Sequence, residues 1–203
     1  MKRNLLFLAI SLSVVAVFSA FKISGDVLPI GSALPKGDVK MKDVLNKEVS
    51  LLDAKKKNGL LVMFSCNTCP YVVKNQERTN AIASFALQNN VGVIILNSNE
   101  AQRTNDDSFE AMQAYAKTQG YQWYYAVDKD AVLADAFGAN RTPENFLFDK
   151  NMKLVYHGAI DDNPSVAADV KRQHLKEAIN ELVAGKDIAV KESRSVGCSI
   201  KRK

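Results

Sequence analysis

The chain has 203 residues, 47% of them hydrophobic, with 27 Lys and Arg against 22 Asp and Glu and a formal net charge of +5. The basic residues are mixed with acidic ones and are not interleaved with aromatic residues, which argues against a nucleic-acid-binding protein. Three cysteines exclude a dense disulfide framework and predict one pair with one thiol left over.

Residues 1–20 predict a secretory signal peptide. Lys2 and Arg3 form a basic start, residues 5–18 are almost continuously apolar, and Ser19-Ala20 offers small residues for cleavage. The apolar run is short for a transmembrane helix, which needs about 20 residues. We therefore expect export to the periplasm with cleavage, and an uncleaved leader that anchors the protein in the membrane is the alternative.

The rest of the chain is long enough for one domain with a substantial core and too short for two. We expect this domain to span residues 28–185. Residues 186–203 then form a basic C-terminal tail that carries Cys198.

The first half of the domain predicts a β-α-β unit after two short strands. These strands are expected at residues 39–41 and 49–52, followed by a strand at 59–64, a helix at 70–89 and a strand at 91–96. The last two strands are continuous apolar runs, which indicates burial on both faces of a sheet. A helix that joins neighbouring strands makes them parallel, with a right-handed crossover.

The second half continues the alternation of helices and strands, and Asp128 is expected to cap a short helix. In chain order, we expect a loop at 98–107, a helix at 108–119, a strand at 123–127, a helix at 131–137, a hairpin of strands at 145–149 and 154–157, and a helix from 164 to about 184. This order predicts an α/β domain of thioredoxin type: a central mixed sheet with flanking helices, an N-terminal extension and an inserted helix.

The segment Cys66-Asn67-Thr68-Cys69-Pro70 lies between the predicted buried strand and the helix that follows it. Unpaired N–H groups and the dipole at a helix N-terminus stabilise a thiolate, so this position favours redox chemistry. Zinc sites share the spacing but need four ligands, and only Cys198, His157 and His174 remain, all far away in the sequence. Neither a metal nor an organic cofactor is implied.

Three motifs together resemble the peroxiredoxin-like branch of the thioredoxin superfamily, the redoxin or AhpC/TSA-like group. They lie at residues 64–72, which read FSCNTCPYV, at 138–149, and at 197–201, which read GCSIK. The resemblance extends over about residues 30–201. It implies an oxidoreductase whose substrate is either a peroxide or a protein thiol or disulfide, and it leaves this choice open.

Cys69 is the expected nucleophile. It lies five residues after Phe64 and directly before Pro70, positions that resemble those of the attacking cysteines of thioredoxins and peroxiredoxins, with Cys66 as its partner. The opposing assignment makes Cys66 the exposed first cysteine of an ordinary CxxC. Cys66 also occupies the position where peroxiredoxins carry a threonine, three residues before the cysteine.

The resemblance assigns a substrate-binding role to Thr142-Pro143. It implies a cis peptide bond opposite the cysteines, which leaves the Thr142 backbone free to pair with a bound peptide, whereas composition alone favours trans. Arg141 would lower a thiolate pKa or orient a peroxide, with a solvated surface arginine as the alternative.

Cys198 lies five residues from the end of the sequence and directly after Gly197. It is either an uninvolved tail thiol or a resolving cysteine that attacks a Cys69 sulfenate or a Cys66–Cys69 disulfide. The favoured function is an exported oxidoreductase that cycles the Cys66/Cys69 pair. A copper chaperone that uses Cys66, Cys69 and His157 is the non-enzymatic alternative, although its cysteine spacing fits poorly and His157 is more simply a hydrogen-bonded structural histidine.

Overall fold

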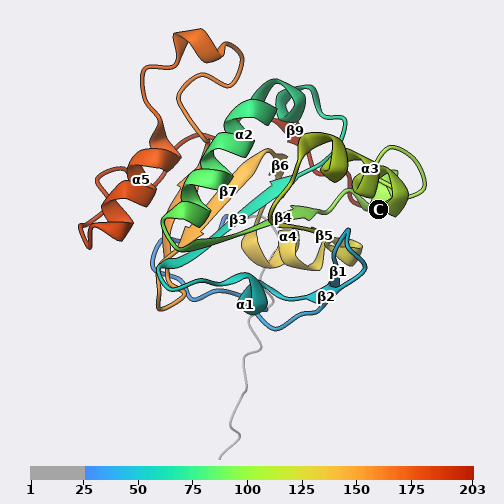
Figure 1. Ribbon diagram of the computed structural model, residues 1–203, viewed down its shortest axis with the longest axis horizontal. Coiled ribbons are helices and arrows are strands. Elements are labelled where there is room, and N and C mark those ends of the chain that lie inside the picture. The colour runs from blue at the N-terminus through green and yellow to red at the C-terminus, as the bar shows by residue number, and fades with distance from the viewer. Residues whose placement is uncertain (1–25) are drawn as a thin grey trace, which may run out of the picture.

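The computed structural model describes residues 26–203, so the predicted leader lies outside the described residues. Its centre is a five-stranded sheet in the order β5-β4-β3-β7-β8 (Figure 1). The strands are β3 (Gly59–Ser65), β4 (Val91–Asn97), β5 (Tyr124–Val127), β7 (Glu144–Phe148) and β8 (Leu154–Gly158). Strands β3, β4 and β5 are parallel, and β7 runs antiparallel to both β3 and β8. The predicted thioredoxin-like fold with a mixed sheet is confirmed.

Helices cover both faces of this sheet. The first face carries α2 (Pro70–Gln88), α3 (Phe109–Gln119) and α5 (His174–Val183), and the second carries α1 (Leu51–Ala54) and α4 (Val132–Phe137). Side chains alternate along β3, so Leu61 and Met63 pack on the first face while Leu60, Val62 and Phe64 pack on the second. Each face thereby has its own apolar core.

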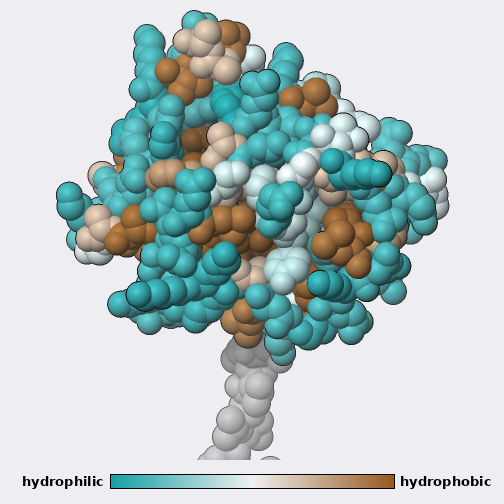
Figure 2. All heavy atoms as spheres, viewed as in Figure 1, coloured by the Kyte–Doolittle hydropathy of each residue, from teal (hydrophilic) through white to brown (hydrophobic). Residues whose placement is uncertain are grey.

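Shorter elements complete the fold. They are β1 (Met41–Lys42), β2 (Glu48–Val49), β6 (Arg141–Thr142), β9 (Cys198–Ser199) and the 3-10 turns η1 (Glu100–Gln102), η2 (Lys129–Ala131) and η3 (Ala167–Asp169). No helix among residues 26–203 is long and apolar enough to cross a membrane. The face visible in Figure 2 is largely hydrophilic, with separate hydrophobic patches between the polar side chains.

Local signals in the sequence start and stop several helices as expected. Pro70 occupies the first turn of α2, where its missing N–H costs nothing, and Gly120 ends α3 with φ of 65°. The Asp128 carboxylate accepts hydrogen bonds from the backbone N–H groups of Leu133 and Ala134, both at 2.9 Å. The Asp128 side chain therefore caps the first N–H groups of the short helix as expected, although the residue at the N-cap position of α4 is Ala131.

The prediction of a strand at residues 49–52 is correct only for residue 49 and wrong for the rest. Strand β2 ends at Val49, and α1 begins at Leu51. Ser50 Oγ accepts from the Asp53 N–H at 3.2 Å while the Asp53 carboxylate accepts from the Ser50 N–H at 2.8 Å. This reciprocal capping box starts a helix in a segment whose apolar residues also suit a strand.

The last long helix begins ten residues later than expected, at His174 and not at Pro164. The Asn163 side chain accepts from the N–H groups of Ser165 and Val166, and the Asp162 side chain accepts from the Lys171 N–H at 3.0 Å. These bonds give the backbone an alternative to a helix. As a result Ala168, which lies in the segment expected to be helical, is exposed outside the helix, while Leu175 and Ile179 inside the helix are buried.

The segment after α5 packs against the domain. It runs beside β8, where the His157 N–H donates to the Lys191 carbonyl at 2.9 Å and the Ser193 N–H donates to the His157 carbonyl at 3.0 Å. It then crosses to β6, and β9 pairs with that strand (Figure 1). Ile188 and Ile200 are buried in the two cores, which fixes the segment at both ends of its path.

Candidate active site

Two cysteines lie where β3 ends and α2 begins. Cys66 directly follows Ser65, the last residue of β3, and Cys69 is the N-cap residue of α2. The expected start of the helix directly after Cys69 is therefore confirmed. Both side chains are buried, with exposed fractions of 2% for Cys66 and 6% for Cys69. The end of a buried strand holds both sulfurs inside the protein, at the start of the helix.

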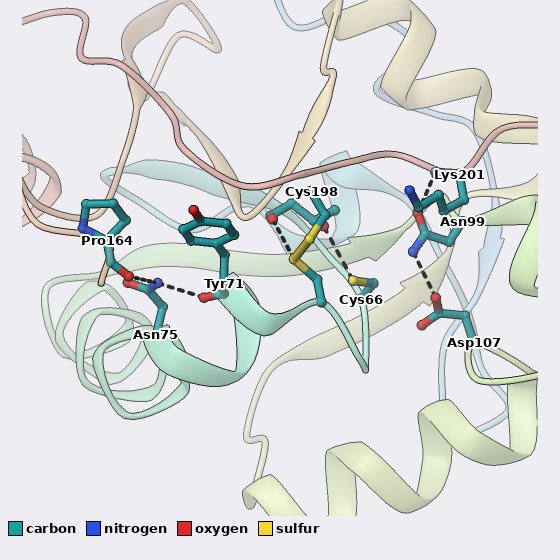
Figure 3. The surroundings of a disulfide bond; sticks show 10 residues. Cys66, Tyr71, Asn75, Asn99, Asp107, Pro164, Cys198 and Lys201 are labelled. Atoms are coloured by element: carbon teal, nitrogen blue, oxygen red, sulfur yellow. Dashed lines mark hydrogen bonds between the residues drawn. A yellow bond between two sulfur atoms is a disulfide. The ribbon is translucent and has the colours of Figure 1, made fainter. Parts of the chain in front are cut away.

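Cys69 forms a disulfide with Cys198 of β9, across a sequence separation of 129 residues and with the Cα atoms 6.1 Å apart. Cys66 is a free thiol beside this bond (Figure 3). The three cysteines therefore meet in one place. The pairing differs from the expected Cys66/Cys69 pair, because the tail brings a third sulfur to the helix N-terminus.

Thr142 contacts all three cysteines. Its hydroxyl Oγ1 lies 3.4 Å from Cys66 Sγ, and its carbonyl oxygen lies 3.3 Å from Cys69 Sγ. Its backbone pairs with that of Cys198 in the β6–β9 ladder. The Thr142-Pro143 bond is cis, as the family resemblance implied. Arg141 has an exposed side chain, and its backbone pairs with Ser199.

A buried carboxylate that the sequence analysis did not single out holds this loop. Glu144 Oε2 accepts from the N–H groups of Asn140 at 2.8 Å and Arg141 at 3.1 Å, and Glu144 Oε1 lies 2.8 Å from His157 Nε2. His157 is thus a hydrogen-bonded histidine, as its structural interpretation predicted. The missed signal was an acidic residue at the start of a strand that is buried along its whole length.

A second missed carboxylate, Asp107, fixes the loop that contains the cysteines. Asp107 is fully buried and accepts from the Asn67 N–H at 2.9 Å, from Asn97 Nδ2 at 2.7 Å and from Asn99 Nδ2 at 2.8 Å. Asn99 Oδ1 in turn accepts from the Lys201 N–H at 2.8 Å. One polar network therefore links the cysteine loop, the end of β4 and the C-terminal segment. Figure 3 shows the part of it that joins Asp107, Asn99 and Lys201.

The two sulfurs of the CxxC motif differ in their electrostatic surroundings. Burial is the main cause that raises the pKa of the Cys66 thiol; the Thr142 hydroxyl opposes this rise and the Asp107 charge adds to it. Cys66 is therefore a protonated thiol at neutral pH. Cys69 lies at the N-terminus of α2, where the helix dipole favours a thiolate once the disulfide is reduced.

A cavity of about 230 Å³ opens beside the disulfide. Its walls include Cys66, Cys69, Thr142, Asp107, Cys198 and Lys201. This volume is smaller than the roughly 300–1,000 Å³ of typical sites for drug-sized ligands. The site can therefore admit a small molecule to the sulfurs while the C-terminal segment is in place.

The three ligands of the copper hypothesis do not form a metal site in this structure. Cys69 is bonded to Cys198, and His157 is paired with Glu144. Within residues 26–203, no group of three His, Cys, Asp or Glu side chains is arranged to hold a metal ion.

Comparison with known proteins identifies relatives of this site and fold. The Redoxin family matches residues 29–173. An uncharacterized conserved protein from Geobacillus kaustophilus is 32% identical, with 86% of this chain and 93% of that chain covered and a TM-score of 0.80. A hypothetical protein from Sinorhizobium meliloti 1021 is also 32% identical, with coverages of 88% and 97% and a TM-score of 0.79.

A more distant structure shares the fold alone. It is a mutant of PrxQ from Xylella fastidiosa, 19% identical, with 79% of this chain and 99% of that chain covered and a TM-score of 0.57. No curated protein matches the sequence.

Proposed function

The chain belongs to the Redoxin family and is an oxidoreductase, and we propose that it reduces small peroxides through Cys69 and Cys198. The observation that carries this proposal is the disulfide between a helix N-cap cysteine and a strand of the C-terminal segment, with a small cavity beside it. In this cycle the working pair is Cys69/Cys198, in place of the Cys66/Cys69 pair expected from spacing.

The chemistry balances with these two thiols and one peroxide. The Cys69 thiolate attacks one peroxide oxygen, the O–O bond breaks, and an alcohol or water leaves after taking up a proton, so that Cys69 becomes a sulfenic acid. The Cys198 thiol then attacks the sulfenic sulfur, which forms the Cys69–Cys198 disulfide and releases water. A thiol reductant returns both cysteines to the reduced state.

Cys69 suits the first step better than Cys66 does. Cys69 lies at the N-terminus of α2, which stabilises the thiolate, whereas burial raises the pKa of Cys66 and keeps it protonated. Both cysteines line the cavity, so access to the cavity does not distinguish them. The difference in ionisation therefore distinguishes Cys69 from Cys66 as the nucleophile.

The C-terminal segment supports a small oxidant as the substrate. Strand β9 pairs with β6, and this covers the backbone edge of Thr142 that the family resemblance assigns to a bound peptide. A protein substrate must displace β9 before it can use this edge. A hydrogen peroxide molecule can reach the sulfurs through the cavity with β9 in place.

A second candidate function is thiol–disulfide exchange with another protein. Two observations favour it: Cys66 stands where peroxiredoxins carry a threonine, and the Thr142 edge already pairs with an extended strand that carries a cysteine. If the protein exchanges disulfides with another protein, Cys198 occupies the position that a cysteine of the substrate protein would take.

One reduced sample distinguishes the two candidates. Its oxidation by hydrogen peroxide is followed by stopped flow, and its reduction of insulin disulfides is followed in parallel. We expect rapid oxidation by peroxide that is lost in Cys69→Ser, and a Cys198→Ser variant that stops after one turnover. Lys203→Ser, at the end of the same segment, is the control. Slow peroxide oxidation together with fast insulin reduction would instead establish protein disulfides as the substrate.

We also propose that the protein is exported to the periplasm, with an uncleaved leader as a membrane anchor the alternative. The support is the basic start, apolar run and small residues of positions 1–20. Mass spectrometry of the mature N-terminus in a host cell tests this. A cleaved N-terminus near Ala20 in the periplasmic fraction is expected, while intact Met1 in the cytosol would contradict export.

A further inference from the structure

We propose that Cys66 reopens the Cys69–Cys198 disulfide by internal exchange, so that the site alternates between two disulfides and Cys198 of the C-terminal strand is freed from its covalent bond. The inference rests on the proposed function, because it takes Cys69 and Cys198 as the pair that oxidation creates. It gives the third cysteine of the chain a role as an attacking thiol. The Cys66/Cys69 pair then appears as a second state of the same site.

The contacts around Thr142 place the attacking sulfur. Cys66 Sγ is 3.4 Å from Thr142 Oγ1, and Cys69 Sγ is 3.3 Å from the carbonyl oxygen of the same residue. Cys66 and Cys69 belong to one small buried cluster, and Cys198 packs against it. Cys66 therefore needs no large movement of the chain to approach Cys69.

The exchange step is balanced without an outside oxidant or reductant. Cys66 loses its proton, and its sulfur attacks Cys69 Sγ. The Cys66–Cys69 bond forms as the Cys69–Cys198 bond breaks, and Cys198 leaves as a thiolate that takes up a proton. One disulfide and one thiol are present before and after the step, so no net oxidation occurs. Thr142 Oγ1 lies 3.4 Å from the attacking sulfur, where its hydroxyl can donate a hydrogen bond to the thiolate.

Besides the disulfide, noncovalent contacts hold β9 and the residues after it. Ile200 is buried in one core, the Lys201 N–H donates to Asn99 Oδ1 at 2.8 Å, and Arg202 donates to Asp135 and to the Ala139 carbonyl. The β6–β9 ladder contains two residues from each strand. Beyond it, the Ile200 N–H donates to the Asn140 carbonyl at 3.0 Å, and the Ala101 N–H donates to the Lys201 carbonyl at 2.9 Å. Each such bond stabilises the folded arrangement by only about 0.5–1.5 kcal/mol. Breaking the Cys69–Cys198 bond therefore removes the covalent restraint on the strand and leaves only noncovalent contacts to hold it.

Gly197 gives a way to shift the balance between the two disulfides. The backbone of Gly197 packs so closely on Thr142 that a Cβ atom there would collide with the Thr142 carbonyl oxygen and approach its carbonyl carbon to 2.7 Å. Because the Thr142 atoms belong to the backbone of a buried loop, they cannot shift easily. The segment that contains Gly197 and β9 must therefore move away. A Gly197→Ala substitution thus disfavours the paired strand and leaves the Cys66 thiol unchanged.

Thiol mapping tests the exchange, since each oxidised form has a different free cysteine. The reduced protein is oxidised with one equivalent of hydrogen peroxide, incubated, quenched with acid, denatured and alkylated with N-ethylmaleimide. Cys66 is labelled in molecules with the Cys69–Cys198 bond, and Cys198 is labelled in molecules with the Cys66–Cys69 bond. We expect both labels in the wild type, and a ratio of Cys198 to Cys66 label about tenfold higher in Gly197→Ala.

The pH dependence supplies a second readout that needs no variant. The attacking species is the Cys66 thiolate, and burial raises its pKa, so the thiolate fraction grows about tenfold for each pH unit below that pKa. The rate at which Cys198 becomes labelled should rise accordingly from neutral to alkaline pH. A rate that does not change with pH would contradict attack by Cys66.

Two controls separate this inference from the proposed function. Ser199→Ala alters the exposed neighbour of Cys198 without a collision, and we expect the wild-type ratio of labels. Label confined to Cys66 in both the wild type and Gly197→Ala, in a protein that still reduces peroxide, would overturn the exchange and leave the proposed function standing. Peroxide reduction that survives in Cys69→Ser would overturn the proposed function itself.

Discussion

Strand β3 and Cys66 in the loop that follows it are both buried, but their surroundings differ. The Phe64 ring contacts the rings of Phe137 and Phe146 edge to face, with centroids 5.4 and 5.7 Å away. Cys66, two residues later, lies against the hydroxyl of Thr142, and the nearby Asp107 charge helps to raise the pKa of its thiol. Burial in the first region removes apolar surface from water. Burial in the second keeps polar and reactive groups at fixed positions, so the two regions should respond differently to substitution.

The largest expected effect is in the cysteine region. Cys69→Ser should lower the rate of peroxide reduction by at least about 1,000-fold, because a hydroxyl at this position is a far weaker nucleophile than a thiolate. The free energy of unfolding of the reduced protein should change little, since the two side chains have similar shapes. Peroxide consumption and urea unfolding under reducing conditions measure the two effects. A variant that keeps a tenth of the wild-type rate would contradict the assignment.

The apolar region should show the opposite pattern. Phe146→Ala removes a fully buried ring that contacts Phe64 and Phe137, and it should lower the free energy of unfolding by about 3–5 kcal/mol. Turnover per folded molecule should stay near the wild-type value. Urea unfolding of the reduced protein, with activity measured well below the transition, tests both statements. A cost below about 1 kcal/mol would mean that this core collapses around the gap.

Asp107→Asn should change both the free energy of unfolding and the pKa of Cys66. Both effects should be smaller than those of the two substitutions above. The amide N–H₂ group would oppose one of the N–H donors from Asn67, Asn97 or Asn99, at a cost of about 1–3 kcal/mol. The loss of the negative charge should also lower the pKa of Cys66, since that charge raises it. The pH dependence of iodoacetamide labelling at Cys66 measures this shift.

Asp106→Asn is the matched control for that substitution. The side chain of Asp106 is exposed, whereas the buried hydrogen bonds to the cysteine loop are made by the side chain of Asp107. We expect wild-type labelling of Cys66 in this variant. Equal shifts in both variants would show that general surface charge, and not the buried carboxylate, sets the pKa of Cys66.

The smallest effect is expected at α1, which lies outside both regions. Lys40 and Ser50 lower the pKa of the exposed Asp53 from 3.8 to about 2. The folded-state pKa lies below the unfolded value, so the stabilisation by Asp53 is present above about pH 4 and is lost as the pH falls through about 2. The difference in stability between wild type and Asp53→Asn should therefore shrink across this window in acid unfolding. A constant difference would contradict the capping role.

Much of the framework could be predicted because its signals are local. The apolar runs of β3 and β4, Pro70 at the start of α2 and Gly120 at the end of α3 each depend on residues within a few positions of one another. Where competing local signals overlap, the prediction was wrong. The capping box of Ser50 and the side chain of Asn163 each redirected the backbone in a segment whose apolar pattern fitted another element.

The sequence by itself determined that two thiols lie at a strand-to-helix junction, and that Cys69 directly precedes the helix. Only the tertiary structure decided which sulfur Cys69 meets, because Cys198 is 129 residues away and reaches it through the pairing of β9 with β6. The same holds for Glu144 and Asp107. Their roles come from buried hydrogen bonds to groups on other segments, and such bonds depend on how the segments pack, which no local pattern of residues records.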